Sequence, residues 1–315
     1  MTADQPRQVM VTGRRDLTPT ITEFVLSPTP GGSLPPISAG AHATLRTPSG
    51  AMRRYSVINP ELSPETYVIA VKRETDSRGG SASMHEQARL GTVMDLMEVE
   101  NSFALTDAPD YLLIAGGIGI TPILSMAREL DRAGKPFRII YCSRDARETA
   151  YLDEMSITYG DRLTLHHDGG DPAEVYDFWD HFEEPQKAHV FCCGPKPLME
   201  EIRAISGHWP EGRVHFEDFK PVEVVRADDV AFDVELRKSG RTITVPADRS
   251  ILEALRDAGE RTVSSCESGT CGTCKTRLIA GDADHRDMVL MDEERAEKIM
   301  ICVSRSAGGG LVLDL

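Results

Sequence analysis

The sequence predicts a multidomain fold: an antiparallel β-barrel, then a doubly wound α/β domain, then a small α+β domain. Three observations predict this order. The first hundred residues hold short β-rich runs separated by glycine and proline, a pattern typical of antiparallel barrels. After Pro109 the pattern becomes strand, helix, strand, which indicates a parallel sheet covered by helices. At 315 residues the chain also exceeds the usual size of one hydrophobic core, so two or three domains are expected.

The first domain is predicted over residues 1–107. A helix is expected near its end, at Ala82–Leu90, after a short loop. Its strands are expected at Gln8–Arg14, Ile21–Ser27, Ala43–Arg46, Arg53–Ile58 and Tyr67–Lys72.

Two short motifs of this domain carry groups suited to a phosphate and a flat ring. In the R-x-Y-S motif, Arg53 and Tyr55 share one face of a strand and Ser56 takes the other. A guanidinium can bind a phosphate bidentately, a phenol can cover an aromatic ring, and a hydroxyl can hydrogen-bond its edge. Gly79-Gly80-Ser81 stands at a helix start, where backbone N–H groups can receive a phosphate. The alternatives are a surface ladder of Arg and Tyr and a plain serine cap.

The second domain is predicted over residues 108–220 and contains a glycine-rich turn. The apolar run Tyr111–Ala115 is typical of a buried parallel strand and leads into Gly116-Gly117-Ile118-Gly119-Ile120-Thr121-Pro122. Glycines there let the backbone approach a ligand closely, although Pro122 replaces the third glycine of the dinucleotide fingerprint. A purely structural turn is the alternative. The other expected elements are helices at Ile123–Leu130 and Lys196–Ile205 and strands at Phe137–Tyr141, Ala188–Cys193 and Val214–Glu217.

Four cysteines dominate the last part of the chain. Cys266, Cys271 and Cys274 have the spacing C-x4-C-x2-C, and Cys302 follows after 27 more residues. This spacing is typical of a plant-type 2Fe-2S cluster held by four thiolates. Glycines between the cysteines permit the tight, partly left-handed backbone that such a loop needs. Structural zinc is the alternative, but zinc sites more often show two C-x2-C pairs.

The elements around these cysteines predict a small α+β domain over residues 230–315, preceded by a linker at 221–229. A hairpin is expected first, then a capped helix, and later a short helix and a strand that carries Cys302. Their expected ranges are Ala231–Arg237 and Arg241–Val245 for the hairpin, Ile251–Ala258 and Asp292–Lys298 for the helices, and Ile299–Val303 for the strand.

Charge and composition exclude some functions. The formal net charge of −15 argues against a nucleic-acid partner, since phosphates would be repelled. Residues 1–15 lack the apolar core of a signal peptide, and no apolar run of 18 residues occurs, so no membrane span is expected. We therefore expect a cytoplasmic protein whose other cysteines, Cys142, Cys192 and Cys193, are reduced thiols.

The two motifs of the first domain together resemble the flavin domain of the ferredoxin reductase superfamily. The short loop, with no aromatic residue placed to stack on an adenine, resembles the FMN-binding branch. In reductases of this superfamily an aromatic residue commonly shields the flavin, and Phe219 is the candidate here; a residue filling an interdomain gap is the alternative. The resemblance implies that FMN is bound by Arg53, Tyr55, Ser56, Val71, Lys72, Gly79, Gly80, Ser81 and Phe219.

The second domain resembles the NAD(P)-binding half of the same superfamily. The resemblance places Gly117–Thr121 under the pyrophosphate and nicotinamide, and Cys193-Gly194-Pro195 on the other side of the nicotinamide. It places Ser143 and Arg144 at the adenosine ribose, where an arginine could also bind a 2′-phosphate; NADH is favoured over NADPH. The implied nucleotide-binding residues are Gly116, Gly117, Gly119, Thr121, Ser143, Arg144, Cys193, Gly194 and Pro195. Within the whole set, Ser56, Thr121 and Cys193 are expected to position the two rings for hydride transfer.

Residues 230–315 resemble a plant-type ferredoxin, which implies a β-grasp fold and one-electron transfer. With the ferredoxin last, the complete chain resembles the phthalate dioxygenase reductase family, the FMN and 2Fe-2S reductases of two-component Rieske oxygenases and demethylases. The resemblance implies an oxidoreductase that passes electrons from NADH through FMN and the cluster to a terminal oxygenase component. Two alternatives remain open: a reductase for a cytochrome P450 or another acceptor, and an iron–sulfur redox sensor or binding module.

Overall fold

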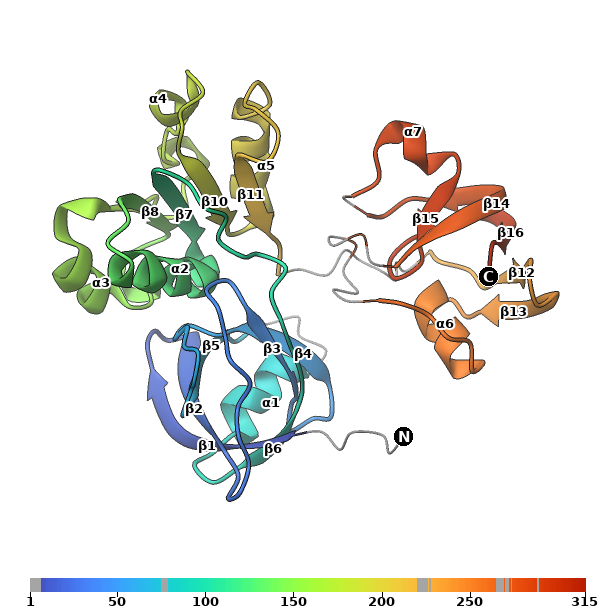
Figure 1. Ribbon diagram of the computed structural model, residues 1–315, viewed down its shortest axis with the longest axis horizontal. Helices are drawn as coiled ribbons and strands as arrows, with labels where there is room; N and C mark the ends of the chain where they lie inside the picture. Colours follow the sequence, from blue (N-terminus) through green and yellow to red (C-terminus); the bar gives the residue numbers. More distant parts are fainter. Residues whose placement is uncertain are drawn as a thin grey trace. The chain divides into compact units, whose positions relative to one another are not determined.

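The structure, a computed structural model, describes residues 7–74, 79–219, 226, 228–264, 269, 272, 274–287 and 289–315. The chain divides into two compact units, Met1–Glu217 and Asp218–Leu315. The first unit contains an antiparallel and a parallel sheet, and the second contains a mixed sheet (Figure 1). The multidomain fold class predicted from the sequence is confirmed.

The first sheet is antiparallel throughout and has the strand order β4-β3-β6-β1-β2-β5. Its strands curve into a barrel (Figure 1). One strand, β6, was not expected, because it contains Asp95, Glu98 and Glu100, which are poor strand formers; its pairing with β1 and β3 overrides this preference. The strands are β1 Arg7–Asp16, β2 Ile21–Pro28, β3 His42–Arg46, β4 Met52–Ser56, β5 Tyr67–Lys72 and β6 Val93–Glu100.

The helix of the barrel, α1, spans Gly80–Gln87, so the predicted range Ala82–Leu90 began and ended too late. Gly79 is the N-cap, with φ 88°, a left-handed conformation that glycine adopts without steric cost. The helix can therefore begin at the second glycine of the motif. The imidazole of His85 fixes it to β5 through the Val71 carbonyl, 2.9 Å away.

The second sheet is parallel, with the order β11-β10-β7-β8-β9. Its strands are β7 Tyr111–Gly116, β8 Phe137–Ser143, β9 Leu163–His167, β10 His189–Cys193 and β11 Val214–Glu217. The α-helices are α2 Ile120–Arg132, α3 Leu152–Tyr159, α4 Trp179–Phe182 and α5 Lys196–Ile205. The short 3-10 turns are Gly117–Gly119, Ala146–Glu148, Gly160–Arg162 and Pro172–Glu174. The predicted helix Ile123–Leu130 was too short, because Pro122 is accepted in the first turn of α2.

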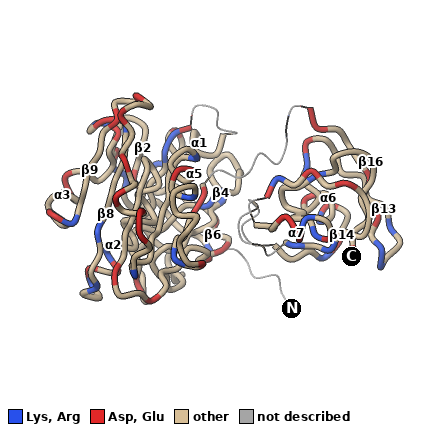
Figure 2. Tube along the Cα trace, turned by 90° about the horizontal axis from the view of Figure 1, so that it is seen from above, with Lys and Arg blue, Asp and Glu red and all other residues tan. Residues whose placement is uncertain are grey.

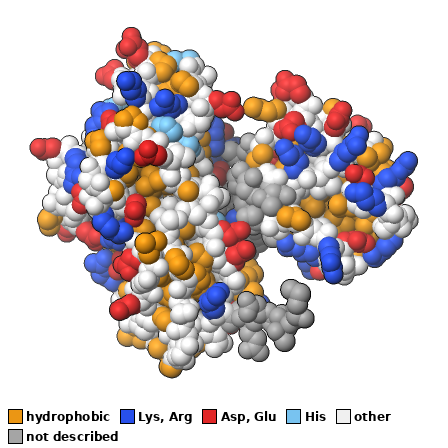
Figure 3. Space-filling view, viewed as in Figure 1, with side chains coloured by type: hydrophobic (Ala, Val, Ile, Leu, Met, Phe, Trp, Pro, Cys, Tyr) orange, Lys and Arg blue, Asp and Glu red, His pale blue; other side chains and the backbone are white. Residues whose placement is uncertain are grey.

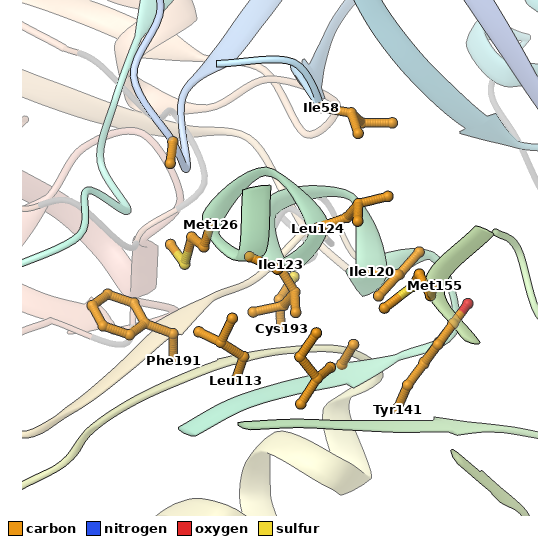
Figure 4. Close-up of a cluster of buried hydrophobic side chains, with 14 of the residues drawn as sticks. Ile58, Leu113, Ile120, Ile123, Leu124, Met126, Tyr141, Met155, Phe191 and Cys193 are labelled. Atoms are coloured by element: carbon orange, nitrogen blue, oxygen red, sulfur yellow. The ribbon is translucent and has the colours of Figure 1, made fainter. Parts of the chain in front are cut away.

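Alternate residues of β7 face the two sides of the parallel sheet. Leu113 and Ala115 join a cluster with residues of α2 and α3, whereas Leu112 and Ile114 join one with residues of α4 and α5. The first cluster continues into the barrel through Ile21, Ala39, Ile58 and Ala70. Figure 4 shows Ile58 on one side of α2 and Ile123 on the other, facing Leu113 and Cys193 of the parallel sheet. The predicted boundary at residue 107/108 therefore lies within one compact unit, and the division of this unit into domains 1–107 and 108–220 stays a prediction.

The second unit has a mixed sheet with the order β13-β12-β16-β14-β15, in which only the β12–β16 pair is parallel among the described strands. Its elements are β12 Phe232–Leu236, β13 Arg241–Val245, α6 Ile251–Asp257, β14 Lys275–Asp284, α7 Asp292–Arg295, β15 Lys298–Met300 and β16 Arg305–Leu313. Ser250 and Glu253 form a capping box at the start of α6. The predicted strand Ile299–Val303 was wrong at its end: β15 stops at Met300, and Cys302 lies in the turn that follows.

A buried ion cluster fixes the start of the second unit. The carboxylate of Asp229 accepts two hydrogen bonds from the Arg286 guanidinium, at 2.5 and 2.8 Å, and lies 3.4 Å from Nε of Arg305. The three side chains are 8%, 3% and 2% exposed. Hydrogen bonds from Arg286 lower the pKa of Asp229 to about 2. Asp229, predicted as the last linker residue, is thus held against the mixed sheet.

We expect Asp229→Asn to destabilise the second unit by about 3 kcal/mol, because the buried Arg305 guanidinium loses its carboxylate partner and Arg286 is left with the carboxylate of Asp284. Hydrogen exchange measured by mass spectrometry should show faster exchange of the β12 and β16 amides at neutral pH. The stabilisation should also fade as the pH falls from about 3.8 toward the lowered pKa of about 2, since protonation discharges the carboxylate. The exposed carboxylate Asp282 provides the control; equal protection in Asp229→Asn and Asp282→Asn would contradict the expectation.

Charged residues of both signs are interspersed along the trace of each unit (Figure 2). Acidic side chains gather over α7 (Figure 3), where Glu294 is bonded by Lys275 and Lys298 at 3.1 and 2.6 Å. Within the described residues, no helix is both long enough and apolar enough to cross a membrane.

Candidate functional site

The R-x-Y-S strand and the Gly-Gly-Ser helix start meet in the structure. A Cβ on Gly80 would lie 2.6 Å from Nε of Arg53, so only glycine lets this guanidinium lie against the first turn of α1. An arginine beside a helix N-terminus combines a fixed positive charge with outward N–H groups. This arrangement suits a phosphate, as the sequence predicted for Arg53, Gly79 and Gly80.

Tyr55 and Ser56 each bury a hydroxyl oxygen that has no hydrogen-bond partner among the described residues. Buried hydroxyls are normally hydrogen-bonded, so such groups need a partner beyond these residues. The edge of a flavin ring and its side chain offer acceptors and donors of the required kind. The residues present therefore fit the FMN that the sequence implied, next to the phosphate seat at Arg53.

The predicted FMN residues Val71, Lys72 and Ser81 contact other groups of the protein. Val71 is buried in β5, and its carbonyl is bonded to His85. The Lys72 ammonium lies 3.8 Å from Glu74, and the Ser81 hydroxyl accepts from the backbone N–H of Glu74 at 3.2 Å. Their contact with FMN stays a prediction.

The two glycine motifs of the parallel sheet pack directly against each other. A Cβ on Gly119 would lie 2.1 Å from the carbonyl oxygen of Cys193, and one on Gly116 would lie 2.5 Å from Cδ of Pro195. A Cβ on Gly194 would lie 3.0 Å from the backbone of Gly116. These glycines are required for close backbone approach, at the carboxyl ends of adjacent strands where open α/β sheets bind nucleotides.

Two residues of the turn after β7, Gly117 and Thr121, have different surroundings. Gly117 has φ 53°, and a Cβ added to it would meet no atom within 4 Å, so the turn surface is open there. Thr121 is 2% exposed and donates to the Ile118 carbonyl at 3.1 Å. Thr121 thus holds the turn together through its hydroxyl, and its contact with the nicotinamide stays a prediction.

The predicted ribose residues lie in the loop after β8. The Ser143 hydroxyl is 2.7 Å from that of Thr149, which in turn lies 3.0 Å from Nε2 of His167. Arg144 is exposed, and its carbonyl accepts from the Gly169 N–H at 2.8 Å. The loop is therefore a hydrogen-bonded structure of its own, with the Arg144 side chain at the surface.

The sequence reasoning missed a pair of side chains between the two predicted ring sites. Glu217 is paired with Cys193 across β11 and β10, and His42 is paired with Ser56 across β3 and β4. Oε1 of Glu217 lies 4.0 Å from Nδ1 of His42, with 11% and 6% of their side chains exposed. No local signal in the sequence indicates this contact, because His42 and Glu217 lie in strands of two different sheets.

The environment of this pair shifts both pKa values. Burial raises the pKa of Glu217 to about 8, although the Arg54 guanidinium opposes the shift. Burial, and then Arg54, lower the pKa of His42 to about 4, while Glu100 at 3.7 Å from Nε2 acts in the opposite direction. Both shifts favour the uncharged forms of the two side chains near neutral pH.

We expect the first unit to lose stability as the pH rises from about 6.5 to 8, because the Glu217 carboxyl ionises in the unfolded chain from its ordinary pKa of 4.5 but in the folded chain only near 8. Below pH 6.5 the lowered pKa of His42 acts with the opposite sign and offsets this loss. The loss should be on the order of 2 kcal/mol and should be largely absent in Glu217→Gln. Urea unfolding followed by the fluorescence of Trp179 and Trp209, both in this unit, measures it. Exposed Glu211→Gln is the control, and parallel pH profiles for wild type and Glu217→Gln would refute the assignment.

The predicted cluster ligands lie in the second unit. Cys274 and Cys302 are buried, at 3% and 2% exposure, whereas Cys266 and Cys271 lie outside the described residues. Gly269 and Gly272, between the ligands, have φ of 75° and 80°, and a Cβ on Gly269 would lie 2.8 Å from Val303. The tight left-handed turns that the sequence predicted are thus present, and the described residues fit a thiolate-held cluster.

Phe219, the predicted flavin shield, falls in the second unit and is 39% exposed. Its role at the flavin stays a prediction.

Comparisons with known proteins match both halves of the chain at the level of domains and family. A family model described as a 2Fe-2S iron-sulfur cluster binding domain matches residues 234–307, and one described as an oxidoreductase NAD-binding domain matches residues 113–204. Phthalate dioxygenase reductase of Burkholderia cepacia is 48% identical over 299 residues, which cover 94% of this chain and 93% of that protein. The phthalate 4,5-dioxygenase oxygenase reductase subunit of Pseudomonas putida is 46% identical over 309 residues, covering 97% and 95%.

A solved structure has the same architecture. Phthalate dioxygenase reductase, described as a modular structure for electron transfer from pyridine nucleotides to 2Fe-2S, superimposes with a TM-score of 0.82 at 45% identity. The match covers 98% of this chain and 97% of that one.

Fold and sites define an oxidoreductase with a nicotinamide-nucleotide domain and a 2Fe-2S domain. The similarity extends along nearly the whole length of both chains. The chain belongs to the phthalate dioxygenase reductase family.

Proposed function

We propose that this protein is the reductase component of a two-component Rieske-type oxygenase, carrying electrons from NADH through FMN and a 2Fe-2S cluster to the terminal oxygenase. The observation that carries the proposal is the contact of Glu217 with His42. These side chains neighbour Cys193 and Ser56, so the nicotinamide and flavin sites adjoin within one compact unit. Hydride transfer requires such adjacency, because the donor and acceptor atoms must be in near-attack contact.

In this proposal the barrel, residues 1–107, holds FMN. Arg53 and the first turn of α1 bind the phosphate, while Tyr55 and Ser56 supply the hydroxyls that orient the ring. When bound, the flavin supplies the conversion between a two-electron hydride donor and a one-electron acceptor. No side chain has to act as an acid or base in the hydride step.

Residues 108–220 hold NADH. The packed turns Gly116–Thr121 and Cys193–Pro195 present backbone to the pyrophosphate and nicotinamide, and the loop with Ser143 and Arg144 receives the adenosine ribose. Cys193 and Thr121 keep the nicotinamide face aligned through the turns in which they lie. NADH rather than NADPH is proposed, with Arg144 as the residue that a 2′-phosphate would contact.

Residues 230–315 carry the cluster on Cys266, Cys271, Cys274 and Cys302, joined by the linker 221–229. The cluster passes single electrons to the oxygenase component. Both relatives compared above carry dioxygenase names, which supports an oxygenase as the acceptor. Buried thiols such as Cys192, with a pKa raised to about 12 by burial, suit the reducing cytoplasm that we also propose.

The purified protein tests the proposal directly. We expect its absorbance to show flavin and iron–sulfur bands, extraction to give one FMN and two iron atoms per chain, and NADH to reduce both groups without oxygen. Candidate Rieske oxygenases and a cytochrome P450 are then compared for NADH-dependent product formation. Zinc in place of iron, or the absence of reduction by NADH, would refute the assignment and favour a binding or sensing module.

A further inference from the structure

Tyr151 has an unusual backbone conformation at a domain junction. Tyr151 has φ 61° and ψ 20°, and every other described residue with positive φ is a glycine. It is the N-cap residue of α3. A bulky side chain rarely adopts this conformation, and such strain persists only where surrounding contacts enforce it. The contacts of Tyr151 should therefore reveal what the strain maintains.

The contact that fixes Tyr151 comes from the barrel. The Tyr151 hydroxyl donates to Oε2 of Glu23 in β2 at 2.9 Å, and the tyrosine is 5% exposed. Glu23 has 13% of its side chain exposed and also accepts from Arg15 at 3.1 Å. The bond is thus a largely buried, charge-assisted one between a residue of the barrel and a residue of the parallel-sheet half.

A second bond joins the same two regions. The Thr20 hydroxyl, at the start of β2, donates to Oε2 of Glu148 at 2.9 Å. Glu148 and Tyr151 belong to one loop, which follows Ser143, the last residue of β8. The β1–β2 hairpin therefore holds this loop at two points, three residues apart in the sequence.

Inside the loop, hydrogen bonds carry the constraint back to the predicted ribose residue. Thr149, between the two fixed points, bonds the Ser143 hydroxyl at 2.7 Å and donates to the Asp145 carbonyl at 2.8 Å. The Asp145 carboxylate accepts from the N–H groups of Arg147 and Glu148. Movement of the fixed end would therefore displace Ser143.

We propose that Tyr151 and Glu23 are positioning residues for NADH: the flavin barrel, through this pair, holds loop 143–151 in the conformation that receives the adenosine end of the nucleotide. The inference rests on the proposed function, since it places NADH at this loop. It adds that the binding site for one cofactor depends on the domain that binds the other.

The test compares nucleotides with and without the adenosine. In Tyr151→Phe, we expect the Kd for NADH in anaerobic stopped-flow flavin reduction to rise about tenfold, with the limiting rate unchanged. Calorimetry with ADP-ribose should show the same tenfold weakening, independently of flavin reduction. Reduced nicotinamide mononucleotide, which lacks the adenosine, should reduce wild type and variant equally.

Two further variants separate positioning from a general structural effect. Glu23→Ala should match Tyr151→Phe, whereas Glu23→Gln, which retains an acceptor oxygen, should restore affinity to within about threefold of wild type. Tyr159→Phe on the same helix is the matched control, since its ring packs edge-on against Phe137. Unchanged affinities for NADH and ADP-ribose, or an equal loss with the mononucleotide, would overturn the proposal. If wild type is not reduced by NADH, the proposed function fails, and the ADP-ribose affinities alone still decide for or against the positioning role.

Discussion

Replacing Cys302 by serine should lower the rate of NADH-driven reduction of cytochrome c and of the oxygenase by roughly 100-fold or more. Ferricyanide reduction through the flavin should persist. Cys302 is 2% exposed in the turn after β15, where serine would put a hydroxyl in place of the thiolate. A hydroxyl is a poor iron ligand, and the cluster should be lost or altered. Iron content, the visible spectrum and the two assays together measure the effect.

Cys142→Ser is the matched control for this experiment. Cys142 lies in β8 of the first unit, and burial raises the pKa of its thiol to about 12, so it is inert at neutral pH. The control should keep both activities. Loss of ferricyanide reduction in Cys302→Ser, with the fold intact, would mean that the cluster precedes the flavin, against the proposed order of carriers.

Local sequence signals predicted the parts of the protein in which chemistry dictates residue type. Gly79 is selected by its positive φ, and the glycines at 80, 116 and 119 are required by close approach of other atoms. Each requirement favours glycine and is therefore visible in the sequence. The C-x4-C-x2-C spacing is likewise local. The fold class followed from these motifs together with the change from β-rich runs to alternating strands and helices.

Features that depend on pairing distant segments were not predictable from the sequence. The strands β6, β14 and β16 are stabilised by neighbours far along the chain rather than by their own propensity. The Glu217–His42 contact joins residues 42 and 217 through two different sheets. The positive φ of Tyr151 leaves no sequence signal, and the residue's hydroxyl contacts a glutamate 128 positions away.

The other large effect is expected at the packed turns. Gly119→Ala should slow reduction of the flavin by NADH by roughly 100-fold, because displacement of reacting groups by about 1 Å can have that effect. The added Cβ would lie 2.1 Å from the Cys193 carbonyl oxygen, which is backbone and cannot rotate away. Gly119 has helical φ and ψ of −58° and −8°, so the substitution introduces no backbone strain and its effect is purely steric. Stopped-flow reduction with NADH measures the rate, and FMN content should be unchanged.

Gly207→Ala is a suitable control in the same half of the unit, since its Cβ would meet the nearest atom at 3.7 Å, an ordinary contact. Chemical reduction with dithionite bypasses the nucleotide, so Gly119→Ala reduced in this way should still pass electrons to cytochrome c at the wild-type rate. This combination separates damage to the nicotinamide site from damage to the flavin or the cluster. Normal reduction of Gly119→Ala by NADH would show that the two turns can separate without consequence, and that their close packing does not align the nicotinamide.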